Sequence, residues 1–296
     1  MKRICISINL LLCVLTISSN SYSQDGFPVL EDRYFGQKPP GLTAEVFAPG
    51  IVSTEEHLES GVYFSPDMKE LYFVREGGKY EKRTPVVIRY ENHSWGNESV
   101  TDIKYPLFSR DGNTLYGGNE YRERTDTGWS ELKSLGAPYK DIFIMVLSVS
   151  SKGTYYFDFM EREGNGYISY SRLIDGKREK PQKMSEEINT GKWIAHPYIA
   201  PDESYLMWDA EKEGGYGDGD LYISFRQKDG SWGTAINMGD KINTAHQENG
   251  VHVTPDGKYL MFSRGYEKVR KDGSTHWVAS PYWVDAQVIE TLRPKH

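Results

Sequence analysis

The chain has 296 residues, enough for one large all-β domain or two smaller ones. Aromatic residues make up 13% of it, with 21 tyrosines, a bias expected of strand-rich proteins. The net charge of −7 and the lack of a basic run exclude general nucleic-acid binding, because each phosphate contact needs a cation.

Residues 1–23 have the pattern of a secretory signal peptide. Lys2 and Arg3 form a positive start, an apolar run follows, and Ser21-Tyr22-Ser23 provides a small-x-small cleavage site. The apolar run is too short for a membrane span, so we expect none. Both cysteines of the chain lie in this leader, so the mature protein is expected to form no disulfide. The leader predicts export to the periplasm or cell surface of a Gram-negative bacterium.

Residues 24–42 are rich in proline and glycine, which indicates an extended arm or linker, and residues 43–296 are assigned to one domain. The first segment of that domain, Glu45–Ser53, resembles Thr234–Thr244, and each precedes a copy of the phrase described next. We therefore expect the N-terminal segment to be the outer strand of the last repeat. Such a strand would close a ring and leave no free sheet edge.

One phrase recurs along the rest of the chain. Gly250–Phe262 is nearly repeated at Gly61–Phe73, and weaker copies lie at Tyr105–Tyr116, Leu147–Phe157 and His196–Trp208. Aligning the copies places one small residue before each turn: Ser65, Ser109, Ser150, Ala200 and Thr254. The steps of about 40 to 55 residues match the period of a propeller blade.

Each copy is centred on a Pro-Asp-Gly type of turn. Proline presets the first corner, aspartate bonds its own backbone, and glycine takes the left-handed position. The turn aspartates are therefore expected to shape the chain rather than to catalyse: Asp67, Asp111, Asp202 and Asp256. The third copy has Lys152 in place of aspartate but keeps Gly153, so we expect its turn to survive.

Alternating strand patterns follow each turn, and no segment has a sustained helical period. Trp95, Trp129 and Trp232 each begin a fourth strand and are expected to pack between blades. We predict an all-β fold, a β-propeller of five four-stranded blades. A sixth, degenerate blade within 164–193 or 265–294 is the alternative. The tail 282–292 is predicted to form the last strands of the final blade, which would compete with the N-terminal strand for the outer position.

The phrases Ser65-Pro66-Asp67 with Leu71-Tyr72-Phe73, and Thr254–Leu260, resemble the repeats of PD40, or WD40-like, β-propellers. These propellers include the C-terminal domain of the TolB family of periplasmic proteins. The resemblance covers about residues 43–292. It implies a propeller fold, but not a function, because such propellers serve as binding platforms, enzymes and scaffolds.

Loops that lead into the innermost strands gather at the mouth of a propeller channel. His57 and Glu59 stand eight and six residues before Ser65, and His246 and Glu248 stand at the same offsets before Thr254. If the ring closes, the two pairs are expected to meet at one side of the mouth. They would there bind a divalent metal or act as general acid and base. Alternatively, both glutamates accept backbone N–H bonds and the histidines are solvated.

Two further positions complete the candidate site. His196, four residues before Ala200, has Trp193 nearby, and such a pair suits stacking on a sugar or packing between blades. The candidate ligand-binding residues are thus His57, Glu59, Trp193, His196, His246, Glu248 and His252, and the metal candidates are the two His-x-Glu pairs.

The function expected from these observations is a monomeric, non-catalytic platform that binds a protein, a peptide or a glycan at the channel mouth. It needs no cofactor. The alternative is a propeller enzyme, a carbohydrate hydrolase or lyase, that uses the His-x-Glu pairs with or without a divalent metal.

Overall fold

The computed structural model describes residues 33–54, 57–160 and 166–295. The predicted signal peptide and the first part of the predicted arm lie outside these residues. Within them, the paired strands can be grouped along the chain into five antiparallel units, and the fold is all-β apart from short helical segments.

The units follow one another along the chain. Unit 1 contains β2 (Leu58–Phe64), β3 (Glu70–Gly77), β4 (Tyr80–Glu91) and β6 (Ser99–Val100). Unit 2 contains β7 (Leu107–Phe108), β8 (Thr114–Gly117), β9 (Glu120–Thr125) and β11 (Lys133–Ser134). Unit 3 contains β12 (Leu147–Val149), β13 (Tyr155–Met160), β14 (Gly166–Ser171) and β17 (Gln182–Lys183).

Unit 4 contains β18 (Lys192–Ile199), β19 (Tyr205–Glu211), β20 (Asp220–Phe225) and β21 (Ile236–Asn237). Unit 5 contains β22 (Gln247–Val253), β23 (Tyr259–Val269), β24 (Thr275–Asp285) and, from the other end of the chain, β1 (Glu45–Val46). The remaining short elements are β5 (Ser94–Trp95), β10 (Gly128–Trp129), β15 (Leu173–Ile174), β16 (Lys177–Arg178), the 3-10 helix at Tyr139–Asp141 and α1 (Val288–Leu292).

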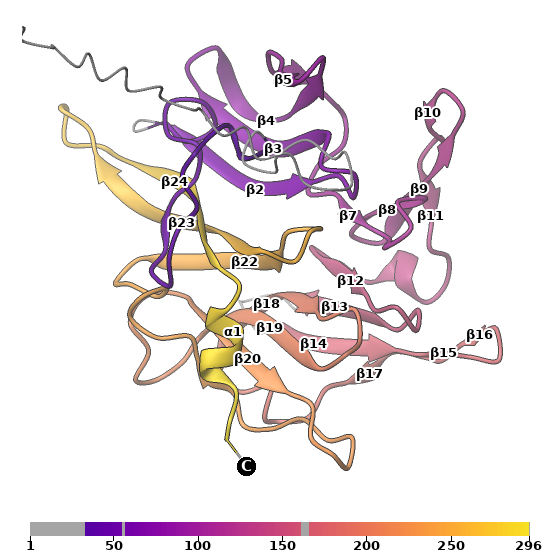
Figure 1. Cartoon of the computed structure of the whole chain (residues 1–296). Coiled ribbons are helices and arrows are strands. Elements are labelled where there is room, and N and C mark those ends of the chain that lie inside the picture. Colours follow the sequence, from indigo (N-terminus) through magenta and orange to yellow (C-terminus); the bar gives the residue numbers. More distant parts are fainter. Residues whose placement is uncertain (1–32, 55–56, 161–165, 296) are drawn as a thin grey trace, which may run out of the picture.

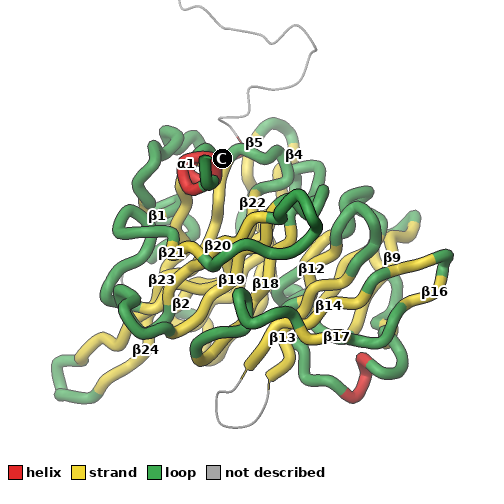
Figure 2. Tube along the Cα trace, turned by 90° about the horizontal axis from the view of Figure 1, so that it is seen from below, coloured by secondary structure: helices red, strands yellow, loops and turns green. Residues whose placement is uncertain are grey.

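The first strand of each unit is the innermost one. Figure 1 shows β2, β7, β12, β18 and β22 around a common centre, with the later strands of each unit further out. Figure 2, turned by 90°, shows the long β23–β24 hairpin projecting from one end of these strands and α1 lying at the other end. This arrangement of repeated four-stranded sheets is that of propeller blades.

The seam between the two ends of the chain matches the predicted strand donation. Glu45 pairs with Trp283 and Val46 with Tyr282, so β1 is the outer strand beside β24. The prediction for the tail was wrong beyond Asp285, because the chain then turns into α1 instead of adding a strand. Units 5 and 1 also touch directly, since Leu58 of β2 pairs in parallel with Ala279 of β24.

The described part of the predicted arm is packed rather than extended into solvent. Tyr34 is buried between units 1 and 5, and its hydroxyl donates to Asp256 at 2.9 Å. The Gln37 side chain donates to the carbonyl of Val46 and accepts from the N–H of Ala48. These contacts hold β1 in place from its outer side.

Hydrophobic clusters lie between consecutive units. One joins units 1 and 2, and three others join units 2 and 3, units 3 and 4, and units 4 and 5. A fifth cluster lies between units 5 and 1 around Phe47, Phe73 and Trp283. The predicted packing of Trp95, Trp129 and Trp232 against such clusters is confirmed.

The Pro-Asp turns have the predicted chemistry. Asp67 accepts bonds from the Ser65 hydroxyl at 2.6 Å and from the N–H of Lys69 at 3.1 Å. Asp111 and Asp256 repeat this pattern, and Asp202 accepts from the N–H of Ser204. The aspartates therefore shape turns, as expected.

The turn of unit 3 survives without its own aspartate because unit 4 supplies a carboxylate. Glu203 accepts from the Ser150 hydroxyl at 2.8 Å and from the Lys152 ammonium at 3.2 Å. Glu203 itself is 6% exposed. The lysine that breaks the repeat thus has a partner in the neighbouring turn.

Candidate functional site

Five equivalent residues ring one end of the central space. They stand four positions before the aligned small residues, and all five line a single cavity of about 730 Å³: Gly61, Tyr105, Val146, His196 and Gly250. We call this space the front cavity. Its ring residues lie in or just before the first strand of each unit.

A backbone irregularity produces this ring. In β2 the pairing register shifts between Ser60 and Tyr63, and in β22 it shifts between Asn249 and His252. Gly61 and Gly250 take positive φ angles of 62° and 69° at these bulges. His196 has a φ of 50° at the same position of β18, a conformation that costs a non-glycine residue about 1 kcal/mol or more.

His196 is held by two carboxylates at the base of the front cavity. Its Nδ1 lies 2.9 Å and 3.0 Å from the two oxygens of Asp209, and its backbone N–H donates to Asp158 at 3.1 Å. Asp158 also accepts the N–H groups of Met145 and Val146. Because Nδ1 is bonded to Asp209, Nε2 is the ring nitrogen that remains to bond a ligand in the cavity.

The charge state of His196 follows from these neighbours. Burial alone would lower its pKa, but the charge and hydrogen bond of Asp209, together with the charge of Asp158, raise the pKa to about 9. His196 is therefore an imidazolium at neutral pH and donates hydrogen bonds. A histidine in this state is a poor general base.

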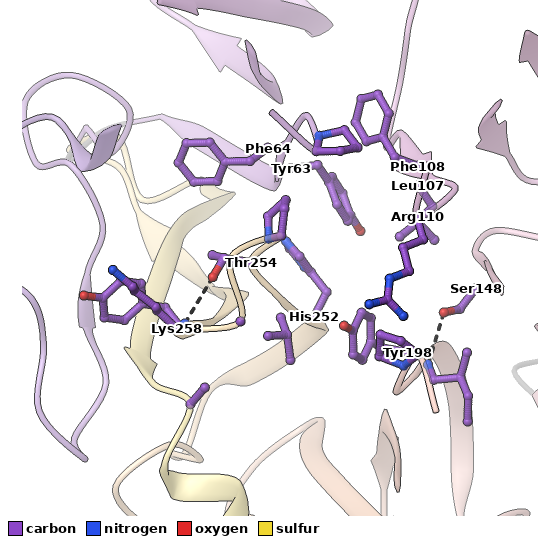
Figure 3. Close-up of a pocket in the computed structure, with 18 of the residues that line it drawn as sticks. Tyr63, Phe64, Leu107, Phe108, Arg110, Ser148, Tyr198, His252, Thr254 and Lys258 are labelled. Carbon is purple, nitrogen blue, oxygen red and sulfur yellow. Dashed lines mark hydrogen bonds between the residues drawn. The ribbon is translucent and has the colours of Figure 1, made fainter. Parts of the chain in front are cut away.

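A second ring of equivalent residues closes the channel beyond the first. These residues stand two positions before the aligned small residues: Tyr63, Leu107, Ser148, Tyr198 and His252, all labelled in Figure 3. The Tyr63 and His252 rings stack with their centroids 4.3 Å apart. A space of only about 10 Å³, enough for about one water molecule, lies between the two rings of residues, so the axis is narrow at this point.

The second ring is also the floor of another cavity, which opens at the Pro-Asp turns and measures about 960 Å³. We call it the rear cavity. Figure 3 shows Arg110 and Lys258 on its walls. Burial lowers the pKa of His252 to about 4, so this histidine is neutral under ordinary conditions. His252 thus belongs to the barrier between the two cavities.

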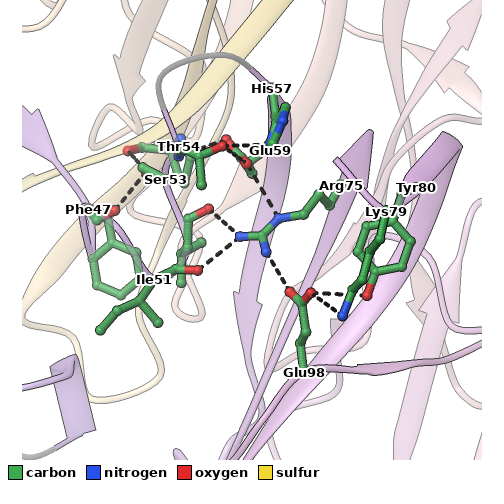
Figure 4. Close-up of polar contacts among 12 residues, drawn as sticks. Phe47, Ile51, Ser53, Thr54, His57, Glu59, Arg75, Lys79, Tyr80 and Glu98 are labelled. Carbon is green, nitrogen blue, oxygen red and sulfur yellow. Dashed lines mark hydrogen bonds and ion pairs between the residues drawn. The ribbon is translucent and has the colours of Figure 1, made fainter. Parts of the chain in front are cut away.

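The predicted His-x-Glu pair of unit 1 is a structural clasp (Figure 4). Glu59 is fully buried and accepts from the hydroxyl of Thr54 at 2.6 Å and from its N–H at 3.1 Å. Arg75 lies opposite, with Nε 3.4 Å from Glu59, and donates to the carbonyls of Ile51 and Val52. The carboxylate therefore fixes the loop that leads into β2.

Unit 5 repeats this clasp. Glu248 is fully buried and accepts from the hydroxyl and N–H of Thr244 at 2.7 Å and 3.0 Å. Arg264 donates to Glu248 at 2.7 Å and to the carbonyl of Ile242. Burial raises the pKa of both clasp glutamates, although the threonine hydrogen bonds and arginine charges act in the opposite direction.

The two His-x-Glu pairs therefore do not meet at the mouth, contrary to the expectation from the sequence. The bulges at Gly61 and Gly250 turn Glu59 and Glu248 away from the channel, because an extra residue reverses the alternation of side chains. Of the alternatives drawn from the sequence, the one in which the glutamates pin their loops fits the structure. Among the described residues, no three His, Cys, Asp or Glu side chains gather as metal ligands.

The other candidates are dispersed. His57 bonds to the Thr54 hydroxyl at 3.0 Å and lines a separate groove, described below. His246 is exposed and stacks on Tyr266 with 4.7 Å between ring centroids. Trp193 is 50% exposed at the start of β18. Only His196 reaches the front cavity.

Sequence reasoning missed Tyr105, Asp158 and Asp209. The signal for Tyr105 was present, because aligning the position four residues before each small residue gives the ring of the front cavity. The two aspartates lie on second strands and were hidden in buried segments, Tyr155–Met160 and Tyr205–Glu211. They were not distinguishable there from turn-forming carboxylates.

No family model and no curated protein sequence matches the chain. Among solved structures, it is similar to TolB from Acinetobacter baumannii, with 16% identity over 79% of this chain and 59% of that chain and a TM-score of 0.44. It therefore spans less than two thirds of TolB. A gluconolactonase from Xanthomonas campestris matches with 11% identity over 84% of this chain and 95% of that chain, at a TM-score of 0.45.

A putative 6-phosphogluconolactonase from Bacteroides uniformis matches with 14% identity over 73% of this chain and 82% of that chain, at a TM-score of 0.40. At these TM-scores the similarities decide neither fold nor function. The architecture rests on the strand pairings and the clusters between units.

Proposed function

We propose that this chain is an exported, non-catalytic binding module, a closed propeller of five blades that holds a peptide, a protein segment or a glycan at its front cavity. The observation that carries the proposal is His196. It is a charged donor fixed by Asp209, and it stands where other units have glycine or a neutral residue.

The closed ring is supported by contacts that recur between units. The N–H of His196 donates to Asp158 of unit 3, and the N–H of Gly250 donates to Asp209 of unit 4. The N–H of Gly61 makes the corresponding bond across the seam, to the Ser263 hydroxyl of unit 5 at 3.2 Å. A shared bond of this kind is expected if units 5 and 1 are ordinary neighbours in a ring.

Removing residues 43–53 tests ring closure. The deletion takes away β1 and the buried side chains of Phe47 and Val52, so we expect a large loss of stability throughout the ring. Thermal melting followed by circular dichroism measures it. A truncated protein that melts like the full-length chain would contradict closure by this strand.

The front cavity has the mixed lining of a binding site. Phe143 and Leu132 line it while remaining 68% and 49% exposed, and Tyr105 lies against Gly61. Apolar walls with a few fixed polar groups are the usual composition of ligand pockets.

No helix among the described residues has the length and apolar character of a membrane span.

Binding is favoured over catalysis by the state of His196. The hydrogen bonds described for its ring and backbone go to Asp209 and Asp158 rather than to a hydroxyl or thiol that it would activate. The alternative enzyme was built on Glu59 and Glu248, and both are enclosed in the clasps.

The proposal is tested with peptide and glycan arrays probed by the purified protein. We expect a defined ligand class whose affinity falls about tenfold in His196→Gln, the cost of one charge-assisted hydrogen bond. His246→Gln is the matched control, because that exposed ring lies outside the cavity, and it should bind normally. Turnover of a bound glycan, lost in His196→Gln, would overturn the non-catalytic function.

A further inference from the structure

A groove of about 840 Å³ runs between hairpins of units 5 and 1. One wall comes from the β3–β4 hairpin and the other from the β23–β24 hairpin, which projects beyond the rest of the molecule in Figures 1 and 2. The two units are adjacent at this point, because Leu58 pairs with Ala279. The groove is therefore built at the seam of the ring.

The lining of this groove is basic, in contrast to the chain as a whole. Four cationic side chains, Arg83, Lys268, Arg270 and Lys271, line it together with two carboxylates, Glu76 and Glu81. Arg83 lies 3.6 Å from Glu76 and forms an ion pair with it, so the excess of positive charge lies on the β23–β24 side of the groove. The whole chain has a net charge of −7. Such a local reversal of charge attracts anions and repels cations.

Two flat rings lie on the walls of the groove, each against a glycine backbone. A Cβ added at Gly77 would lie 2.3 Å from the His57 ring, and one added at Gly265 would lie 2.6 Å from the Trp277 indole. Only glycine allows these close approaches. The rings are thus held in fixed orientations, and such rigid aromatic faces suit stacking against the apolar face of a sugar ring.

The groove adjoins the front cavity. Leu58, Arg83 and Trp277 line both spaces. A ligand that occupies the two together would extend from His196 past Trp277 to the cations of the β23–β24 hairpin. That shape requires a chain rather than a compact small molecule.

We infer that the groove binds an acidic polysaccharide, with carboxylate or sulfate groups beside Arg270 and Lys271 and sugar rings against Trp277 and His57. One end of the polysaccharide occupies the front cavity, and in that respect the inference rests on the proposed function. A groove that combines aromatic rings with cations suits a polymer in which each sugar carries an anionic group.

Isothermal titration with hexagalacturonate tests the inference directly. The groove variant is Arg270→Ser/Lys271→Ser, and the matched control is Lys177→Ser/Lys180→Ser, which removes the same charge from exposed residues outside the groove. We expect about fivefold weaker binding in the groove variant at low salt, from two partly exposed ion pairs, and unchanged binding in the control. Binding should also weaken with added salt.

Three further probes separate the possible partners: cellohexaose, hexaglutamate and a six-residue deoxythymidine strand. Cellohexaose binding as tight as that of hexagalacturonate would overturn the role of charge. Equal binding of hexaglutamate or deoxythymidine would overturn recognition of sugar rings. If His196→Gln loses affinity and the groove variant does not, the proposed function stands and the inference falls. If the protein binds none of these probes and the arrays are blank, both fail.

Discussion

Units 1 and 5 differ from units 3 and 4 in how they use the same end of the propeller. In units 1 and 5 a buried Thr-Glu-Arg clasp fixes the loop before the first strand, and the bulge residue is glycine. In units 3 and 4 the carboxylates of Asp158 and Asp209 instead enclose His196. Features shared by two units serve the backbone, whereas the feature that breaks the repeat faces the cavity.

The largest effect is expected from breaking a clasp. Glu248→Ala leaves the largely buried Arg264 guanidinium without its carboxylate, and we expect a loss of about 3 kcal/mol in the free energy of unfolding. Urea denaturation measures this loss. Glu267→Ala, an exposed site on the neighbouring strand β23, should be nearly neutral. If Glu248→Ala is equally mild, the clasps are not structural.

A smaller effect is expected from His196, and it depends on pH. Because its folded pKa is raised to about 9, its stabilisation is fully present below the unfolded pKa near 6.5 and is lost as pH rises through 9. The wild type should lose roughly 1–3 kcal/mol across this window. His196→Gln should have a flatter profile of stability against pH from 6.5 to 9, and an unchanged slope would contradict the assignment.

The next prediction concerns Glu203, the carboxylate of unit 4 that bonds to the turn of unit 3. Glu203→Ala removes the partner of both Ser150 and Lys152, and we expect a loss of about 1–2 kcal/mol. Burial raises the pKa of Glu203, but the bonds from Ser150, Thr154 and Lys152 outweigh it and lower the pKa. This stabilisation is present above the unfolded pKa and is lost as pH falls through the folded one. Glu186→Ala, on an exposed loop, is the control.

The smallest effect is expected at Trp193. Its side chain is half-exposed, and we expect Trp193→Ala to change the free energy of unfolding by less than about 0.5 kcal/mol. Differential scanning fluorimetry is sufficient to check this. A drop of several degrees would show that the indole packs between units, as the sequence also allowed.

The sequence predicted the parts of the fold that are written as local patterns. The turns at Asp67 and Asp256, the strand units and the pairing of Glu45–Val46 with β24 all follow from repeated short phrases. The site was less predictable, because offsets along a strand give the side chain's face only if the strand is regular. A single bulge at Gly61 or Gly250 reverses that face, and so the repeated glutamates contact the clasp threonines and arginines instead of facing the channel.

The stack of Tyr63 on His252 limits the size of any molecule that could pass along the central axis. Because the axis narrows to a space of about 10 Å³ at this stack, the molecule presents two cavities on opposite faces rather than one wide channel. A polymer does not fit through this narrow point from one face to the other. A ligand bound in the front cavity is therefore released through the same opening by which it entered. The opposite face is then free to hold a different molecule at the same time.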